Sequence, residues 1–365
     1  MKTPILPSGA LIDWYRENRR NLPWRLTTDP YPVWVSEVML QQTRVNTAIP
    51  YYRRFLQQWP TIGRLSRTRE ERVLKLWEGL GYYARARNLL KAARMIRRKF
   101  EGKIPLDAAS FGSLPGVGPY ICAAVLSIAG GLPLPVVDGN VLRVATRFWG
   151  VGEDIRKPAT RNRIHRFLQG TIPPDKPGDF NQALMELGAL CCRPQSPACP
   201  SCPLQGECHA RAEGTVDILP CRSPRPAIPH YPVVIAVILD RHRRMFVQKR
   251  PSRRHLGGLW EFPGGKVREN EPRRQALVRE CLEELHTTVI PGEKIATVRH
   301  AYTHFRITLS VYLCRLAPRA PAPDSPQPGR WVTFDQLSRL PFPAANHKFF
   351  PRLKACLRDP SPAAG

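Results

Sequence analysis

Acidic residues are scarce in this sequence. Asp and Glu total 29 against 56 Lys and Arg, which gives the 365 residues a formal charge of +27. A positive excess of this size predicts a polyanionic partner, and nucleic acid is the foremost candidate. The excess is spread along the chain, so it is not the charge of one basic tail. The alternative is a basic soluble protein without a nucleic-acid partner.

Long apolar runs are also missing. No stretch is apolar for long enough to span a bilayer, and residues 1–10 lack the basic-then-apolar pattern of a secretory signal. We therefore expect a cytoplasmic protein with no membrane partner. In that compartment a framework of disulfides is not expected, so the ten cysteines favour metal binding wherever they cluster.

The alternation of apolar and polar residues that is typical of strands is absent from the first part of the chain and present in the last part. This difference divides the sequence into two domains. Residues 1–212 are predicted to form an all-α domain, 213–230 a proline-rich extended linker, and 231–365 an α/β domain. The predicted helices begin at Leu11 and then cover 33–43, 51–58, 69–78, 84–100, 106–111, 120–129, 140–149, 159–169 and 179–190. The predicted strands are 233–239, 245–249, 295–297, 308–316 and 330–332, with a helix at 271–285.

The segment from Leu114 to Cys122 joins two predicted helices and predicts a helix–hairpin–helix. Gly116 and Gly118 permit a tight turn with positive φ, and Pro119 suits the first position of a helix. The amides of residues 120–122 are then expected to be free to bind a backbone phosphate. The alternative is an ordinary glycine turn between two core helices.

A cysteine cluster follows the last predicted helix of this domain. Its spacing over residues 192–208 is C-x6-C-x2-C-x5-C, with only one Cys-x2-Cys pair. A structural zinc site more often has two such pairs, so an iron–sulfur cluster held by four thiolates fits better. Cys191 could compete as a ligand. The predicted ligands are Cys192, Cys199, Cys202 and Cys208.

The hairpin together with this cysteine spacing resembles the endonuclease III superfamily of DNA glycosylases. Residues 36–43, 79–88 and 137–141 look like adenine DNA glycosylases of the MutY type. The resemblance implies base excision repair of adenine mispaired with 8-oxoguanine or guanine in double-stranded DNA, with a [4Fe-4S] cluster. It also implies a monomeric, nucleoid-associated protein, expected to be bacterial.

Two carboxylates are the expected centre of the chemistry. Cleavage of an adenine glycosidic bond requires protonation of a poor leaving group and stabilisation of an oxocarbenium-like sugar. Glu37 lies in an apolar helix, where burial raises a carboxyl pKa, and we assign it as the general acid. Asp138 is assigned as the anion beside the sugar. The alternatives are a surface glutamate and a helix N-cap.

Position 120 indicates the subclass. Bifunctional relatives carry a Schiff-base lysine at this place, whereas this chain has Tyr120. The resemblance therefore implies a monofunctional enzyme in which Tyr120 and Asn140 orient the site. A bifunctional endonuclease III-like glycosylase for damaged pyrimidines is the first alternative. It is also possible that Tyr120 only packs.

The family match also supplies residues that contact the extruded base and the opposite strand. Gln42 and Tyr82 are expected to enter the base stack, although Tyr82 could equally be a core aromatic. Thr43 and Leu80 are expected near 8-oxoguanine. The walls of the adenine pocket are expected to be Trp24, Arg25 and Glu186.

The second domain carries a sequence that resembles the Nudix box, with Gly265 and Glu271 followed by Arg279. Glu280, Glu283 and Glu284 fall on one helix face, and three carboxylates placed in this way suit Mg²⁺. We expect Mg²⁺ to bind there only if the domain hydrolyses nucleotides. The box departs at its end, where His286-Thr287 replace a glycine and an aliphatic residue. An exposed acidic face is the alternative.

In the MutY family this MutT-like domain usually recognises 8-oxoguanine. Tyr302, Thr303 and His304 match the family loop that approaches the lesion, and Asn346 resembles the MutT asparagine that binds the oxidised guanine. Each stretch could be an ordinary turn. We favour recognition. The chain could instead be a nucleotide-pool 8-oxo-dGTP pyrophosphohydrolase or a non-enzymatic lesion-binding protein.

Overall fold

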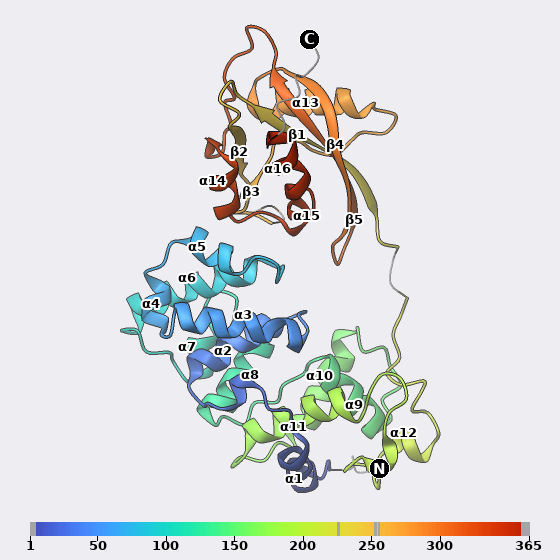
Figure 1. Cartoon of the computed structure of the whole chain (residues 1–365). Helices are drawn as coiled ribbons and strands as arrows, with labels where there is room; N and C mark the ends of the chain where they lie inside the picture. The colour runs from blue at the N-terminus through green and yellow to red at the C-terminus, as the bar shows by residue number, and fades with distance from the viewer. Residues whose placement is uncertain (1–4, 225–226, 252–253, 255, 359–365) are drawn as a thin grey trace. The chain divides into compact units, whose positions relative to one another are not determined.

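The computed structural model describes residues 5–224, 227–251, 254 and 256–358. The chain divides into two compact units, Met1–Arg67 with Asn88–Arg225, and Thr68–Arg87 with Pro226–Gly365. Figure 1 labels the helices and strands along the chain. Within the described part of the chain, no helix is both long enough and apolar enough to cross a bilayer.

Helices dominate residues 5–212, as predicted. Every predicted helix is present. Helix α3 starts earlier than expected, at Val45, and the five-residue helix α4 was not predicted. The elements are α1 (Ser8–Asn18), η1 (Pro23–Arg25), α2 (Pro30–Leu40), α3 (Val45–Gln58), α4 (Ile62–Ser66), α5 (Glu70–Leu76), α6 (Ala84–Lys99), α7 (Ala108–Gly112), α8 (Pro119–Gly130), α9 (Gly139–Trp149), α10 (Pro158–Gln169), α11 (Pro177–Leu190), η2 (Cys199–Ser201) and α12 (His209–Ala212).

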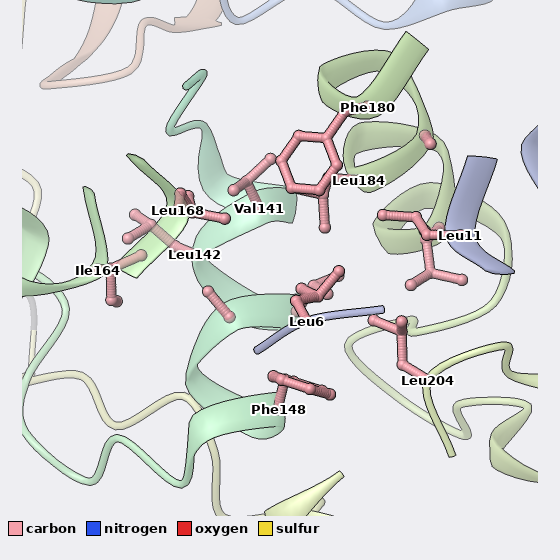
Figure 2. Packing of buried hydrophobic residues seen from close by; sticks show 14 of the residues in the cluster. Leu6, Leu11, Val141, Leu142, Phe148, Ile164, Leu168, Phe180, Leu184 and Leu204 are labelled. Atoms are coloured by element: carbon pink, nitrogen blue, oxygen red, sulfur yellow. The ribbon is translucent and has the colours of Figure 1, made fainter. Parts of the chain in front are cut away.

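Helix α9 is the centre of an apolar cluster of the first unit. Its residues Val141, Leu142 and Phe148 pack against side chains from α1, α10 and α11, including Leu11 and Phe180 (Figure 2). Every residue of α9 from 141 to 149 is buried. This packing fixes the N-terminus of α9, where Asp138 is the capping residue.

A single buried amide holds the loop that leads into Asp138. Asn181 of α11 is fully buried and accepts a hydrogen bond from the Val136 amide at 3.0 Å. Its Nδ2 donates to the Ser127 hydroxyl at 2.9 Å and to the Leu134 carbonyl at 2.8 Å. Because buried backbone groups need partners, these bonds tie the loop to α8 and α11 and position the residue that follows it.

The hairpin between α7 and α8 forms as predicted, with two differences in detail. Gly116 has φ +81, and a Cβ there would lie 2.6 Å from the Cβ of Asn88, so glycine is required. Gly118, however, has φ −93 and is the N-cap of α8, with open space around it. The Cys122 amide donates to the Gly118 carbonyl at 2.9 Å, so the expectation that it is free was wrong.

The predicted linker is partly docked on the helical domain. The Leu219 carbonyl accepts a hydrogen bond from Arg147 Nε at 3.0 Å, and the Ile155 amide donates to the Cys221 carbonyl at 3.2 Å. The Ser223 amide donates to Asp154 at 3.2 Å. The proline-rich composition that predicted an extended linker could not reveal these bonds, because they depend on partners distant in sequence.

The second unit contains a six-stranded sheet with the order β3-β2-β1-β5-β4, in which β6 also pairs with β2. Strands β1 and β5 are parallel, and the other pairs are antiparallel. The elements are β1 (His230–Leu239), β2 (Met245–Lys249), β3 (Trp260–Glu261), α13 (Arg273–Leu285), β4 (Val289–Ala301), β5 (Arg306–Leu316), β6 (Gly329–Val332), α14 (Phe334–Arg339), α15 (Ala344–His347) and α16 (Phe350–Arg358).

Helices cover both faces of this sheet. Alternate residues of β1 point to opposite sides: Val234 and Ala236 join the cluster under α13, whereas Ile235 and Val237 join the cluster under α14–α16. This period of two is the geometry of a strand buried on both faces. The α/β class predicted for residues 231–365 is therefore confirmed.

Candidate active site

One cavity of the first unit brings together the residues predicted for adenine chemistry. Its volume is about 200 Å³, and α2, α8, α9 and α11 each supply part of its wall. Of the predicted site residues, it is lined by Trp24, Arg25, Glu37, Thr43, Tyr120, Asp138, Asn140 and Glu186. Residues far apart in sequence thus meet in one place.

Glu37 is buried in the wall of this cavity rather than exposed on the surface. Its side chain is 5% exposed, and Tyr120 donates its hydroxyl to Glu37 Oε2 at 2.8 Å. Burial raises the pKa of Glu37 to about 7, and the nearby Asp138 charge acts in the same direction, against the lowering effect of the Tyr120 bond. The alternative of a solvent-exposed glutamate is wrong.

Asp138 is both the N-cap of α9 and a wall of the cavity. Its Oδ1 accepts the Val141 amide at 2.7 Å, and its Oδ2 accepts Asn140 Nδ2 at 3.2 Å. Burial raises the pKa of Asp138, while these hydrogen bonds oppose the shift. Arg143 donates to Asn140 Oδ1 at 2.9 Å and to the Cys192 carbonyl at 2.8 Å, so a chain of bonds links the carboxylate to the cysteine loop.

Glu186 has the opposite electrostatic environment. Arg25 donates to both of its oxygens at 2.9 and 2.8 Å, and Arg20 does so at 2.9 and 2.6 Å. Although burial alone would raise its pKa, the hydrogen bonds from Arg25 and Arg20 lower it to about 2. Glu186 is therefore a permanent anion. Sequence reasoning missed Arg20; its basic position just before Trp24-Arg25 was the available signal.

Trp24 lies in a short turn, and the two residues expected to enter DNA have a left-handed backbone conformation. Trp24 lies in the 3-10 turn η1 and meets Tyr52 edge-on, with ring centroids 5.4 Å apart. Gln42 and Tyr82 both have positive φ, 58° and 46°, which is uncommon outside glycine. Gln42 is exposed, whereas Leu80, expected near the lesion, is buried.

The four predicted iron–sulfur ligands line one small cavity of about 30 Å³, and Cys191 lines it as well. Arg147 Nη1 donates to Cys192 Sγ at 3.3 Å. Among the described residues, no group of three or more His, Cys, Asp or Glu side chains is arranged so that it could hold a metal ion as it stands. The cysteines are gathered, and their donor chemistry fits a thiolate-bound metal centre.

The acids of the Nudix-like box face internal partners. Arg279 binds Glu271 at 2.7 Å, Glu280 at 2.8 Å and Glu283 at 3.2 Å. Glu284 instead accepts Gln248 Nε2 at 2.9 Å and the Gly264 amide at 3.3 Å. Over the described chain, these carboxylates do not converge on a common metal position.

The altered end of the box does not prevent the turn that a glycine would make. His286 is the C-cap of α13 with φ 51 and ψ 28, which is the left-handed conformation. Its amide donates to the Leu282 carbonyl at 3.1 Å, so the helix ends as it would with glycine, at a conformational cost of roughly 1–2 kcal/mol.

The two candidate lesion readers lie in the second unit. Thr303 and His304 are exposed in the loop between β4 and β5, while Tyr302 is partly buried against Phe305. Tyr82 also belongs to the second unit, and its hydroxyl donates a hydrogen bond to the Thr303 hydroxyl. Asn346 is buried in α15, which packs against β4.

Both parts of the chain resemble known protein families. Residues 35–169 match the HhH-GPD superfamily of base excision DNA repair proteins, and residues 234–352 match the NUDIX domain. The adenine DNA glycosylase of Rattus norvegicus is 34% identical, with 96% of this chain and 81% of that protein covered. The adenine DNA glycosylase of Buchnera aphidicola subsp. Acyrthosiphon pisum is 31% identical, with 86% and 88% covered.

This chain belongs to the adenine DNA glycosylase family. A thermostable thymine-DNA glycosylase has the same helical fold, with a TM-score of 0.51 at 27% identity over 56% of this chain and 95% of that one. The resemblance inferred from the hairpin and the cysteine spacing is confirmed, as is the order of a helical glycosylase domain followed by a Nudix-like domain. As an adenine DNA glycosylase family member, the chain is a DNA repair enzyme, and DNA is its partner.

The raised pKa of Glu37 predicts a pH-dependent stability difference. The pKa of Glu37 is 4.5 in the unfolded chain and about 7 in the folded protein. The stability that the protonated Glu37 contributes to the fold is therefore fully present below pH 4.5 and is lost as the pH rises through about 7. Above that pH the buried charge costs about 3 kcal/mol. Glu37→Gln should therefore unfold at a higher temperature than the wild type at pH 8, with a much smaller difference at pH 5. Thermal unfolding followed by circular dichroism measures this.

The matched control is Glu17→Gln, which removes an exposed carboxyl of α1. It should leave the unfolding temperature close to that of the wild type at both pH values. Identical pH dependence in Glu37→Gln and the wild type would contradict a raised pKa.

Proposed function

We propose that the helical domain hydrolyses the N-glycosidic bond of adenine paired with 8-oxoguanine or guanine in duplex DNA. The observation that carries this is the pairing of Glu37, buried with a pKa near 7, and Asp138 in one cavity. Action as a monomer is part of this proposal and follows the family resemblance alone. Since the substrate is genomic DNA, the expected place of action is the nucleoid.

Bond cleavage begins with proton transfer from Glu37. A carboxyl group with a pKa near 7 is substantially protonated at neutral pH, so it can donate a proton to a ring nitrogen of adenine, by family resemblance N7. Because the Tyr120 hydroxyl occupies Oε2, the proton is carried on Oε1. The bond between the sugar C1′ and adenine N9 then breaks, and its electron pair leaves with the protonated base.

Asp138 stabilises the sugar cation that remains. Its carboxylate is held by the Val141 amide and by Asn140, which favour the ionised form and keep its direction fixed. A water molecule attacks C1′ and gives its proton to Glu37, which is now a carboxylate. The products are free adenine and an abasic sugar, and Glu37 is again protonated.

Glu186 and the two arginines are proposed to recognise the base. Their three side chains form a fixed hydrogen-bonding wall, in which Glu186 stays ionised at any working pH. A wall of this kind costs little reorganisation when the base enters, because its groups are already oriented.

The absence of lysine at position 120 supports a monofunctional reaction. The purified protein should release adenine from a duplex with A opposite 8-oxoguanine and leave the strand intact until hot alkali is added. Glu37→Gln should abolish release while lesion binding remains, because the amide cannot donate an acidic proton. Adenine release and strand breaks can be followed separately by chromatography and denaturing gels.

Glu17→Gln again serves as the matched control and should retain full activity. Efficient borohydride trapping of a protein–DNA adduct would instead favour the bifunctional endonuclease III-like alternative.

The cysteine cavity is proposed to hold a [4Fe-4S] cluster. Cys192, Cys199, Cys202 and Cys208 would supply the four thiolates, and the buried Arg147 beside Cys192 would offset part of their charge. When bound, such a cluster supplies a rigid cross-link for the loop. No step of base removal depends on it.

Purified protein should contain about four irons per chain. Cys199→Ala should lose most of this iron and weaken DNA binding, whereas Cys122→Ala, outside the cavity, should retain both. Metal analysis together with the absorbance spectrum measures the effect. Stoichiometric zinc without iron in anaerobically prepared protein would contradict the proposal.

The Nudix-like domain is proposed to recognise 8-oxoguanine through Thr303 and Asn346. The partnering of its acids with Arg279 and Gln248 supports recognition over hydrolysis. One observation keeps hydrolysis of 8-oxo-dGTP as a second candidate: His286 makes the left-handed turn, and all the acids of the box are retained.

Thr303→Ala should reduce the preference for 8-oxoguanine over guanine by roughly fivefold, since one lost hydrogen bond costs about 1 kcal/mol. Glu283→Gln should leave that preference unchanged. The ratio of single-turnover rates on the two duplexes measures both. Mg²⁺-dependent conversion of 8-oxo-dGTP to the monophosphate, abolished by Glu283→Gln, would establish the second candidate instead.

A further inference from the structure

A second concave surface of the helical domain is lined by cations and has no acidic residue. It is an open groove of about 460 Å³ beside α6, and it shares no lining residue with the adenine cavity. We call it the α6 groove. Its lining residues are Ser66, Lys91, Arg94, Met95, Arg97, Arg98 and Pro115.

The arrangement of these charges is unfavourable for the helix itself. Lys91, Arg94 and Arg98 follow the spacing i, i+3 and i+7, so neighbouring like charges repel along one helix face. The helix dipole favours cations only in the last turn, which includes Arg97 and Arg98 but not Lys91. Within the described chain, Lys91, Arg97 and Arg98 form no ion pair with a carboxylate. Helix stability therefore does not account for Lys91 and Arg94, which lie before the last turn.

The α6 groove borders the hairpin. Pro115, which lines it, belongs to the turn between α7 and α8, and Gly116 sits directly on Asn88 of α6. The amides of Tyr120 and Ile121 at the start of α8 lack helical partners, because only later residues donate to carbonyls within the helix. The cationic α6 groove and the free amides at the start of α8, both suited to binding phosphate, therefore lie on either side of one turn.

We propose that the α6 groove binds backbone phosphates of duplex DNA outside the segment held by the hairpin. The inference rests on the proposed function. Lys91 and Arg98 are separated by about 10 Å along the helix axis, far enough to reach more than one phosphate of a strand, whose phosphates recur every ~3.4 Å of rise along the duplex axis. Contacts of this type do not depend on base sequence, so they hold the protein on undamaged DNA while it searches.

The double variant Lys91→Gln/Arg98→Gln tests the groove. Binding of the full-length protein to an undamaged duplex is measured over a range of salt concentrations. Since each phosphate contact contributes about 0.9 to the slope of log K against log salt, the slope should become shallower by about 2. Single-turnover release of adenine at saturating protein should be unchanged, because the catalytic cavity is separate.

The control Lys157→Gln/Arg166→Gln removes two exposed charges around α10 and lowers the net charge equally. Its slope should match that of the wild type. The proposal would be overturned if the groove variant had the same slope as the wild type. It would also be overturned if the slope became shallower by the same amount in the groove variant and in the control. If the double variant does not fold, Lys91→Gln alone should shift the slope by about 1, and no shift would overturn the proposal. Normal duplex binding without adenine release would contradict the proposed function but not the groove.

Discussion

The burial of one carboxyl group without a cationic partner in hydrogen-bond contact is the constraint on which the catalytic arrangement depends. Glu37 receives its hydrogen bond from a neutral hydroxyl, whereas Glu186 in the same cavity receives hydrogen bonds from two guanidinium groups. The pKa of the first rises to about 7 and that of the second falls to about 2. Two glutamates thus acquire different roles from their neighbours alone.

The fold maintains this difference by drawing the cavity wall from several separate helices. Helix α2 packs against α8, and α11 packs against both α8 and α9. The buried Asn181 fixes the loop before Asp138, and Arg143 connects Asn140 with the cysteine loop. Loosening any of these helices would admit water to Glu37 and return its pKa toward the usual range, so the stability of the helical domain and its chemistry are coupled.

Local chemistry explains which features were predictable from the sequence. Glu37 lies in a helix that is apolar on nearly all sides, so its burial could be foreseen. Asp138 precedes a glycine and an apolar helix, which predicts an N-cap. The hairpin, the cysteine loop and the strand periods follow from short-range patterns in the same way, and the α/β class of the second domain was correct.

Other features depend on partners that are distant in sequence. The negative φ of Gly118 and the bonded Cys122 amide are exceptions, because they are local and follow from how α8 starts on its N-cap. The docking of residues 219–223 requires Arg147, Asp154 and Ile155, and the clamp on Glu186 requires Arg20. Composition could not indicate these contacts, because exposed and paired arginines look alike in a sequence.

The most direct test is the titration of the Glu37 carboxyl in the intact free protein. Carbon-13 NMR of protein labelled at the glutamate side-chain carboxyl should show a resonance that titrates near pH 7 and is lost in Glu37→Gln. Because burial also raises the pKa of Glu261 to about 7, Glu261→Gln should be recorded in parallel and should retain the Glu37 resonance. If the resonance removed by Glu37→Gln titrates between about pH 4 and 5, as in model peptides, the assignment of Glu37 as a proton donor at neutral pH is contradicted.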